Sequence, residues 1–401
     1  MFNLPFPKKI QDDPSKFLTL NINAKDVKCL AFYYDGEIFK IIGSGSKDVP
    51  EGAVRNGMIV DKETVLEAIN YSVDKATENS GHEIRRVIIG VDGGITNGIT
   101  TTVRMKRVSD SPIQQKEIDE LYEKIDEAAF IQAKNRLFET TGDPDIELST
   151  VTTTDVYVEA DNQRVAFLEG QTSRDIEIAV FNAFVPTFHV KSLQNISKKA
   201  GLEIIAIGSQ MYSLVEWIKS SKQSYDFILI NVSEDSTDVG VIFTGGITST
   251  RTLNIGYIHF LDSISSKMGL SKRESETILK MYNVGKLSDN EIKLVRGCIN
   301  EVIEIWIDGL KILFEDFPGV KTLAPTVYLS GCAMDIQDIY QALEEESWTS
   351  TVPFKNEPVF SRISFTDTDG IINATEKNLS TNWVYVSSTS WIYKKLMEGQ
   401  P

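Results

Sequence analysis

Residues 228–241 read Ile-Leu-Ile-Asn-Val-Ser-Glu-Asp-Ser-Thr-Asp-Val-Gly-Val. An apolar run rich in β-branched residues enters a polar turn, and a second apolar run leaves it before Gly245-Gly246 and a further run at 247–253. The pattern predicts a β-hairpin with a polar tip and a third strand behind it. A hairpin that cradles phosphate has glycines at its tip, because glycine lets consecutive N–H groups approach the anion. Here the tip contains Glu234 and Asp235, and two carboxylates would repel a polyphosphate by about 1 to 4 kcal/mol per close pair.

Size and composition indicate an ordinary soluble protein with several domains. The chain has 401 residues, of which 41% are hydrophobic and 24% are charged. Its net charge of −16 argues against nucleic acid as a partner, because a duplex binder needs a positive surface. No apolar run approaches the ~20 residues of a membrane span. The cysteines and histidines lack metal-site spacing, which favours reduced thiols in a cytosolic protein without a zinc site: Cys29, Cys298, Cys332, His82, His189 and His259.

Strand and helix patterns alternate along the chain, as in an α/β protein. Strands are expected from 17 to a turn at 21–26, and at 27–34, 37–44, 86–91, 103–108, 151–159, 176–184, 203–207, 326–329 and 360–365. A helix is expected after Asp61, a good N-cap, and others at 114–138, 192–200, 211–219, 260–268, 272–281, 289–314, 335–343 and 382–397. Threonine-rich tracts at 100–102 and 152–154 fit edge strands.

The order of these segments resembles the FtsA family of bacterial division actins, with the pilus-assembly protein PilM as a close relative. The segments that carry the resemblance are 41–43 with 57–61, the insertion after Gly93-Gly94, 162–170 and 198–203. Their order and spacing agree with the family over residues 17–397. The resemblance implies an α/β, two-lobed actin-like (ribonuclease H-like) fold with an inserted α+β subdomain of the SHS2 type.

The resemblance also divides the chain into parts. We expect an N-terminal tail (1–16), a first lobe (17–94 and 191–224), the inserted subdomain (95–190), a second lobe (225–262 and 324–372), a helical subdomain (263–323) and a C-terminal helix that returns to the first lobe (373–401).

Both ends of the chain leave two interpretations open. Residues 1–15 form either a loosely held tail or a short segment that docks on a partner or touches a membrane. The final helix either packs on the first lobe, which the small residues at 387–390 favour, or lies on a membrane. The residues available for membrane contact are Trp383, Val384, Trp391, Ile392, Lys394, Lys395 and Leu396.

The family's ATP-site motifs fall on residues of a different kind in this chain. The first phosphate loop, Asp-x-Gly-Thr/Ser, falls on Asn21, Asn23 and Ala24, with Asp26 where lysine is common. The second phosphate loop keeps only Asp238 as an acidic residue, and the adenosine Gly-Gly motif falls on Gly331-Cys332. The candidate cofactor-binding residues implied by the resemblance are Asn21, Asn23, Asn231, Ser233, Asp238, Gly256, Glu276, Lys280 and Gly331.

These departures remove a carboxylate that orients Mg²⁺, remove glycines that cradle phosphate, and add negative charge. We therefore expect a pseudo-ATPase without catalytic residues or a metal site. Two alternatives stay open for the cofactor: the cleft no longer binds Mg·ATP, or it binds ATP in an altered way. In a purely structural interpretation, Asn21, Asn23 and Asn231 are turn residues that tolerate unusual backbone angles, and Asp238 stabilises the hairpin.

Three functions stay open. The first is a cytoplasmic, self-associating scaffold, peripheral at the inner face of the cell membrane, that links FtsZ-like filaments to membrane proteins. The second is an active, ATP-binding, polymerising division actin. The third is a PilM-like adaptor that binds a membrane protein's cytosolic tail in a type IV pilus or secretion complex. For the first, basic residues of the helical subdomain suit an acidic peptide: Lys267, Lys272, Arg273, Lys280, Lys286, Lys293 and Arg296.

Overall fold

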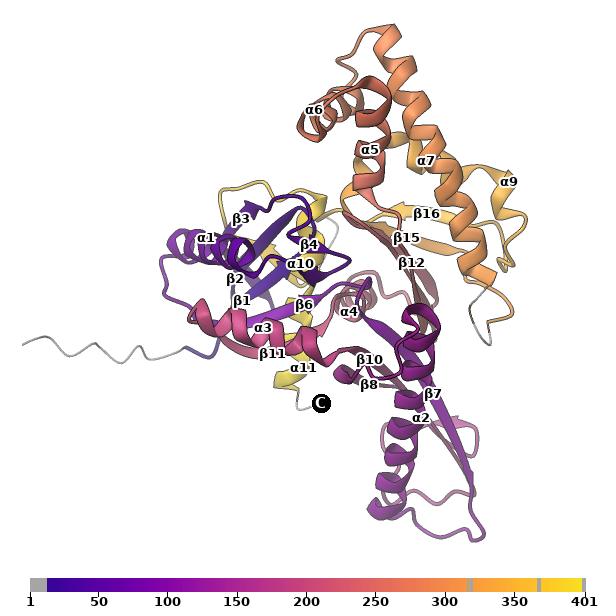
Figure 1. The fold of residues 1–401 in the computed structure, drawn as a ribbon. Helices are drawn as coiled ribbons and strands as arrows, with labels where there is room; N and C mark the ends of the chain where they lie inside the picture. The colour runs from indigo at the N-terminus through magenta and orange to yellow at the C-terminus, as the bar shows by residue number, and fades with distance from the viewer. Residues whose placement is uncertain (1–12, 316, 318–319, 366–368, 399–401) are drawn as a thin grey trace, which may run out of the picture.

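The computed structural model describes residues 13–315, 317, 320–365 and 369–398. Of the predicted N-terminal tail, residues 1–12 lie outside this part of the chain. The described chain forms two lobes, each built on a β-sheet, and two units project in opposite directions from the second lobe (Figure 1).

The first lobe contains a six-stranded sheet in the order β11-β6-β1-β2-β3-β17. Its strands are β1 (Lys16–Ile22), β2 (Asp26–Tyr34), β3 (Phe39–Asp48), β6 (Arg86–Val91), β11 (Glu203–Ser209) and β17 (Ile371–Asn373). Helices α1 (Lys62–Ser80) and α3 (Thr187–Lys199) pack on one face and bury a shared apolar cluster. Asp61 caps α1 as predicted, since its side chain accepts the N–H groups of Glu63 and Thr64. A small hairpin, β4 (Val54–Arg55) with β5 (Met58–Ile59), completes this lobe.

The second lobe contains the predicted hairpin at the centre of its sheet. Strands β12 (Phe227–Val232) and β13 (Thr237–Phe243) form the hairpin, and β14 (Gly246–Leu253) follows as the third strand. On the other side of β12 lie β15 (Thr326–Ser330) and β16 (Val359–Arg362), both parallel to it. The lower projecting unit adds β7 (Asn97–Lys106), β8 (Leu148–Ala160), β9 (Gln163–Arg164) and β10 (Asp175–Pro186), with helix α2 (Gln115–Thr141). In the sheet these strands meet β14 at the pair Ser249 and Ile99, and the Thr100 hydroxyl also donates to the carbonyl of Ile247.

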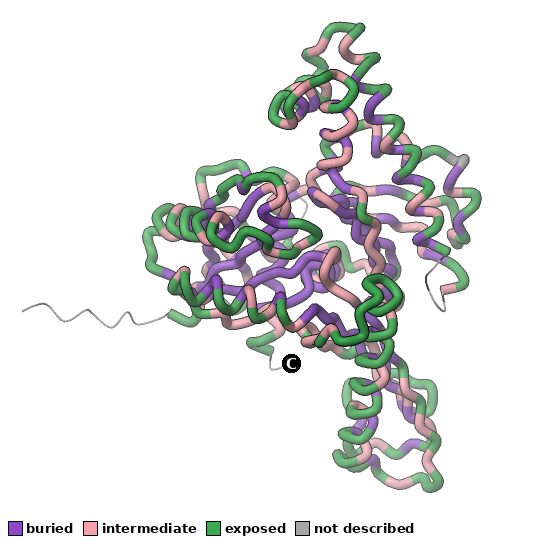
Figure 2. Tube along the Cα trace, viewed as in Figure 1, coloured by how far each residue is buried: buried purple, intermediate pink, exposed green. Residues whose placement is uncertain are grey.

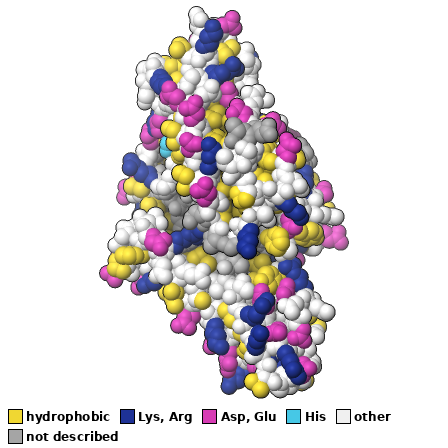
Figure 3. Space-filling model, turned by 90° about the vertical axis from the view of Figure 1, so that its right-hand side faces the viewer, with side chains coloured by type: hydrophobic (Ala, Val, Ile, Leu, Met, Phe, Trp, Pro, Cys, Tyr) yellow, Lys and Arg dark blue, Asp and Glu magenta, His cyan; other side chains and the backbone are white. Residues whose placement is uncertain are grey.

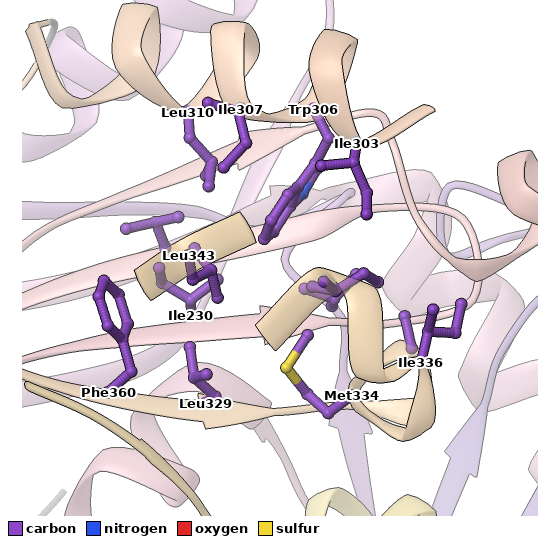
Figure 4. Packing of buried hydrophobic residues seen from close by; sticks show 14 of the residues in the cluster. Ile230, Ile303, Trp306, Ile307, Leu310, Leu329, Met334, Ile336, Leu343 and Phe360 are labelled. Carbon is purple, nitrogen blue, oxygen red and sulfur yellow. The ribbon is translucent and has the colours of Figure 1, made fainter. Parts of the chain in front are cut away.

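A long helix, α7 (Asp289–Glu315), covers the second sheet. Its buried face includes Trp306 and Leu310, which lie over Ile230 of β12 and Leu329 of β15 (Figure 4). Helices α5 (Tyr257–Met268) and α6 (Lys272–Asn283) complete the upper projecting unit. The described residues also form α8 (Gln337–Glu344), α9 (Glu346–Thr349) and 3-10 turns at Cys332–Asp335 and Thr381–Trp383. Burial is concentrated in the two sheets, whereas the outer sides of the projecting units are exposed (Figure 2). On the face shown in Figure 3, basic and acidic side chains are intermixed, so the net negative charge does not form one continuous acidic surface there.

The two lobes share an apolar core. Helices α4 (Gln210–Lys222), α10 (Val384–Ser388) and α11 (Ser390–Met397) contribute Trp217, Tyr385 and Trp391 to a cluster that also contains Phe32 of β2 and Leu229 of β12. Of the residues considered for membrane contact, Val384, Trp391 and Ile392 are buried in the fold, and Leu396 is exposed. This packing contradicts a final helix that lies on a membrane surface through these residues.

Two details differ from the sequence-based expectations. The tract at 100–102 lies in β7, which pairs with β10 along its length and with β14 through Ile99, and this strand begins earlier than predicted. The final helix, predicted as one element, is interrupted at Thr389. The hydroxyl groups of Ser387, Ser388 and Thr389 donate to backbone carbonyls three or four residues earlier, which competes with regular helix hydrogen bonding.

Candidate functional site

A cleft of about 1360 Å³ lies between the two lobes. The turn between β1 and β2 and the loop at 48–56 line it from the first lobe, while the hairpin tip, α5 and α6 line it from the second. Of the candidate residues, Glu276 and Lys280 line the open space. The others lie deeper: Asn21, Asn23, Asn231, Ser233 and Asp238 are each less than a tenth exposed.

The turn between β1 and β2 satisfies its own backbone. The side-chain oxygen of Asn23 accepts the N–H groups of Lys25 and Asp26 at 3.0 and 2.9 Å, and the N–H of Asn23 donates to the carbonyl of Asp26 at 3.1 Å. The Asn23 amide nitrogen donates to Asn21 Oδ1 at 3.1 Å and to Asp26 Oδ1 at 2.9 Å. In a phosphate loop, such N–H groups would bind the anion. Here the side-chain oxygen of Asn23 already accepts hydrogen bonds from the N–H groups of Lys25 and Asp26.

The hairpin tip is closed in a similar way. The N–H of Ser233 donates to the carbonyl of Ser236 at 2.9 Å. The first N–H groups of α5, from Tyr257 and Ile258, donate to the carbonyls of Ser233 and Glu234 at 2.9 and 2.7 Å. A helix N-terminus is a ready anion site only while such groups are free.

The tip also packs closely against neighbouring backbone at two of the candidate glycines. A Cβ atom on Gly256 would lie 2.7 Å from the carbonyl oxygen of Ser233. Gly331 has a φ of 103°, and a Cβ atom there would lie 2.1 Å from the carbonyl oxygen of Val232. Glycine is therefore required at both positions by close packing of the chain on itself.

A buried lysine neutralises part of the acidic charge at the tip. Lys28 is 3% exposed, and its Nζ lies 2.8 Å from Asp26 Oδ1 and 3.8 Å from Glu234 Oε1. Burial lowers the pKa of Lys28, but the charges of Asp26 and Glu234 outweigh burial and raise the pKa overall. Burial raises the pKa of Glu234, and Lys28 opposes that shift. Lys28 is therefore a protonated partner for two carboxylates in the floor of the cleft.

A second group of ions lies at the mouth of the cleft. Lys25 Nζ is 2.7 Å from Glu276 Oε1 and lies 5.3 Å from the centre of the Tyr257 ring. Lys280 also contacts Glu276 Oε1, at 2.7 Å. Burial raises the pKa of Glu276, but the hydrogen bonds from Lys25 and Lys280 lower it overall.

Comparisons with known proteins agree with this architecture. No family model matches the chain. The chain is 23% identical to the cell division protein FtsA of Bacillus subtilis over 328 residues, which is 76% of this chain and 71% of that protein. It is 21% identical to FtsA of Pseudomonas aeruginosa over 336 residues, 78% of this chain and 75% of that protein.

Solved structures add the fold. A chain of the PilM–PilN type IV pilus biogenesis complex superposes with a TM-score of 0.64 at 12% identity, covering 94% of this chain and 97% of that one. The actin-like MreB5 of Spiroplasma citri bound to ADP has a TM-score of 0.50 at 11% identity, covering 96% and 97%. The chain is an FtsA-like protein with the actin fold.

In this FtsA-like chain, the deepest candidate residues form a polar row. Asn231 pairs with Asp238 across the hairpin and with Ser330 on the other side, so the three lie side by side. Both polar atoms of the Asn231 side chain, Asp238 Oδ2 and Ser330 Oγ have no hydrogen-bond partner in the described part of the chain. Gly93 packs so closely that a Cβ atom there would lie 2.0 Å from Asp238 Oδ1. None of the three residues lines the cleft.

Two buried carboxylates face each other in this region. Burial raises the pKa of Asp92 well above its usual range, and the charge of Asp238 raises it further. Burial raises the pKa of Asp238 to about 6. No group of three or more His, Cys, Asp or Glu side chains among the described residues is placed to hold a metal ion.

The residues present do not fit the phosphates of a nucleotide. The N–H groups of Asn23, Lys25, Asp26 and Ser233 are occupied by protein oxygens. The carboxylates of Asp26 and Glu234 line the cleft, with Lys28 beside them. At the mouth of the cleft, the candidate residue Glu276 is already paired with both Lys25 and Lys280.

The structural interpretation of the asparagines needs a correction. Asn21, Asn23 and Asn231 are not among the non-glycine residues with positive φ, so unusual backbone angles do not explain them. Asn21 and Asn231 lie within strands, and Asn23 acts through its side chain. Asp238 does bridge the hairpin and the third strand, because its Oδ1 accepts a hydrogen bond from Thr252 Oγ1 at 2.7 Å.

Sequence reasoning missed Lys25 and Lys28 as members of the site. The alternation of Lys25, Asp26 and Lys28 along the start of β2 was the available signal, because it places two cations beside the turn that carries Asn23.

Proposed function

We propose that this protein is a non-hydrolysing, actin-like scaffold of the bacterial division machinery, which links FtsZ-type filaments to membrane partners. The similarity to FtsA over about three quarters of the chain supports the division role. The observation that carries the non-hydrolysing part is the occupation of both phosphate loops by protein atoms, with Asn23 as the central case. The protein acts by binding and self-association, and its cleft is degenerate.

The scaffold is cytoplasmic and reaches the membrane through a partner or its N-terminal segment. No helix in the described ranges has the length and apolar character needed to span a bilayer. The helical subdomain at 263–323 is the docking region for an acidic filament tail. Several of its cations already have acidic partners: Lys267 with Glu301, Lys272 with Asp262, Lys280 with Glu276, and Arg296 with Asp338. Among the described residues, Arg273, Lys286 and Lys293 form no ion pair, so these three are the basic residues we assign to the contact.

Thermal unfolding with Mg·ATP tests the degenerate cleft. A ligand that binds the folded state stabilises it by RT ln(1 + [L]/Kd), which is ~2.7 kcal/mol at one hundred times Kd. We expect the same midpoint at 0 and 5 mM Mg·ATP, whereas an FtsA protein that binds ATP, run in parallel, shifts upward. A concentration-dependent rise in this protein would favour the active, polymerising alternative.

Capture of partners from a lysate of the source cells tests the division role. We expect the wild-type chain to retain an FtsZ-type protein, and the triple variant Arg273→Ala, Lys286→Ala and Lys293→Ala to lose it. Lys311→Ala, which removes a cation paired with Asp308 on α7, serves as the control. Recovery of a pilus or secretion membrane protein through its cytosolic tail, with no FtsZ-type protein, would favour the PilM-like adaptor. The likeness in fold to the PilM–PilN structure is the observation that supports this alternative.

A further inference from the structure

The two lobes touch across the cleft through polar side chains from opposite sides. We call four of these the interlobe contacts: Lys25 with Glu276, Lys28 with Glu234, Lys272 with Glu51, and the N–H of Asn56 with Asp235. Their distances are 2.7, 3.8, 2.6 and 2.7 Å. In each, one residue belongs to the first lobe and the other to the hairpin tip or α6.

Residues of all four interlobe contacts line the cleft, whereas no residue of the shared apolar core does. The core joins the sheets through α4 and the C-terminal helices, with Trp217 and Tyr385 buried between them. The lobes are therefore joined in two places, through the apolar core and through the polar contacts at the cleft.

The chemistry of the contacts suits a closure that needs no ligand. In a cleft that closes on a polyphosphate, the anion supplies acceptors to N–H groups of both lobes. Here the carboxylates of Glu234, Asp235 and Glu276 supply acceptors from the second lobe, and Lys25, Lys28 and Asn56 supply donors from the first.

We propose that the interlobe contacts hold the lobes closed without nucleotide, and that ionic strength and side-chain charge set how far the cleft opens. The inference rests on the proposed degenerate cleft. Lys28 with Glu234 is buried and resists salt, whereas Lys25 with Glu276 and Lys272 with Glu51 are partly exposed and are screened as salt increases.

The test uses the Lys25–Glu276 pair, because both side chains are partly exposed and a charge change there is compatible with folding. Small-angle X-ray scattering of the full chain measures the radius of gyration at 150 mM and 1 M NaCl without nucleotide. We expect Lys25→Glu and Glu276→Lys each to increase the radius at 150 mM, and the combined swap to restore the wild-type value. Wild type is expected to expand at 1 M NaCl, where the Debye length is only ~3 Å.

Lys311→Glu is the matched control, since its partner Asp308 lies on the same helix and the pair does not cross the cleft. It should leave the radius unchanged. Circular dichroism checks that each variant is folded. If a charge-reversal variant unfolds, the neutral variants Lys25→Met and Glu276→Gln are measured in its place. Single variants with the wild-type radius, or a swap that stays expanded, would overturn the inference. Neither result requires Mg·ATP binding, so failure here is distinct from failure of the degenerate cleft, which the nucleotide titration detects.

Discussion

Asp238 carries a buried carboxyl group beside other acids. It is 1% exposed, and no ion pair among the described residues includes it. Burial raises its pKa from 3.8 to about 6, although the hydrogen bond from Thr252 opposes the shift. The folded protein therefore binds this proton more tightly than the unfolded chain does. By linkage, stability falls as pH rises from about 4 to about 6, and the full cost remains at pH 7.

Asp238→Asn removes that cost and keeps the acceptor for Thr252. We expect the variant to be more stable than wild type at pH 7.5, by up to about 3 kcal/mol, and to lose this advantage near pH 4. Urea unfolding at the two pH values measures the difference. Asp308→Asn, which removes an exposed carboxylate on α7, should change stability by less than ~1 kcal/mol at either pH. A variant at position 238 that is less stable than wild type at pH 7.5 would show that the charge is compensated.

Single side chains were predictable where the signal is local. The Asn-x-x-Asp spacing at 23–26 allows a side chain to cap its own turn, and Asp61 before an amphipathic run predicts an N-cap. The spacing does not show which atoms the Asn23 amide reaches, so it does not separate a role of the side chain from one of the backbone angles. The contact between Lys28 and Glu234 was not predictable, since the residues lie far apart in the chain and meet only when the lobes are placed.

Helix α7 offers two glycines in different surroundings. A Cβ atom at Gly297 would meet nothing within 4 Å, whereas one at Gly309 would lie 2.8 Å from Leu253 Cδ2 of β14. Alanine is favoured over glycine inside a helix by about 1 kcal/mol. Only at Gly297, which is exposed, can alanine add this helix propensity without displacing a neighbouring side chain.

Gly297→Ala is therefore expected to stabilise the protein by about 0.5 to 1 kcal/mol. Gly309→Ala must move Leu253, so overpacking of ~1 to 3 kcal/mol offsets the helical gain and the variant is neutral or destabilised. Chemical unfolding of both variants at one pH provides the comparison. Equal stabilisation by the two substitutions would indicate that α7 is not seated on β14 as described.

Most elements were predictable because their apolar residues recur with helix or strand period. The face of α7 and the hairpin at 228–241 are the clearest cases, and both formed with nearly the predicted bounds. The prediction was wrong where tertiary context decides. β7 begins at Asn97, six residues before the predicted start. The hydroxyl groups at 387–390 bond to nearby backbone carbonyls and interrupt the final helix.

The whole molecule depends on its last helices for the core that joins the lobes. Trp391 is 6% exposed and lies 5.9 Å, centre to centre, from the ring of Phe39, while Tyr393 stacks on Phe17. Removing a large side chain from such a core leaves a cavity that the surroundings fill only in part.

We expect Trp391→Ala to cost about 3 to 5 kcal/mol of unfolding free energy. Leu396→Ala, at a position 44% exposed on the same helix, should cost less than ~1 kcal/mol. Thermal or urea unfolding in vesicle-free buffer gives both values. If both variants lost a similar, small amount of unfolding free energy, the final helix would be only loosely attached to the core. It would then be available to bind a membrane surface.

The turn at Asn23 has a consequence for when the protein is active. Its N–H groups find their acceptors within a few residues, as soon as that turn folds. A scaffold built in this way would be insensitive to the cell's ratio of ATP to ADP, and starvation would leave it assembled. The cell would then have to regulate it by how much is synthesised and degraded, and by the supply of its binding partners.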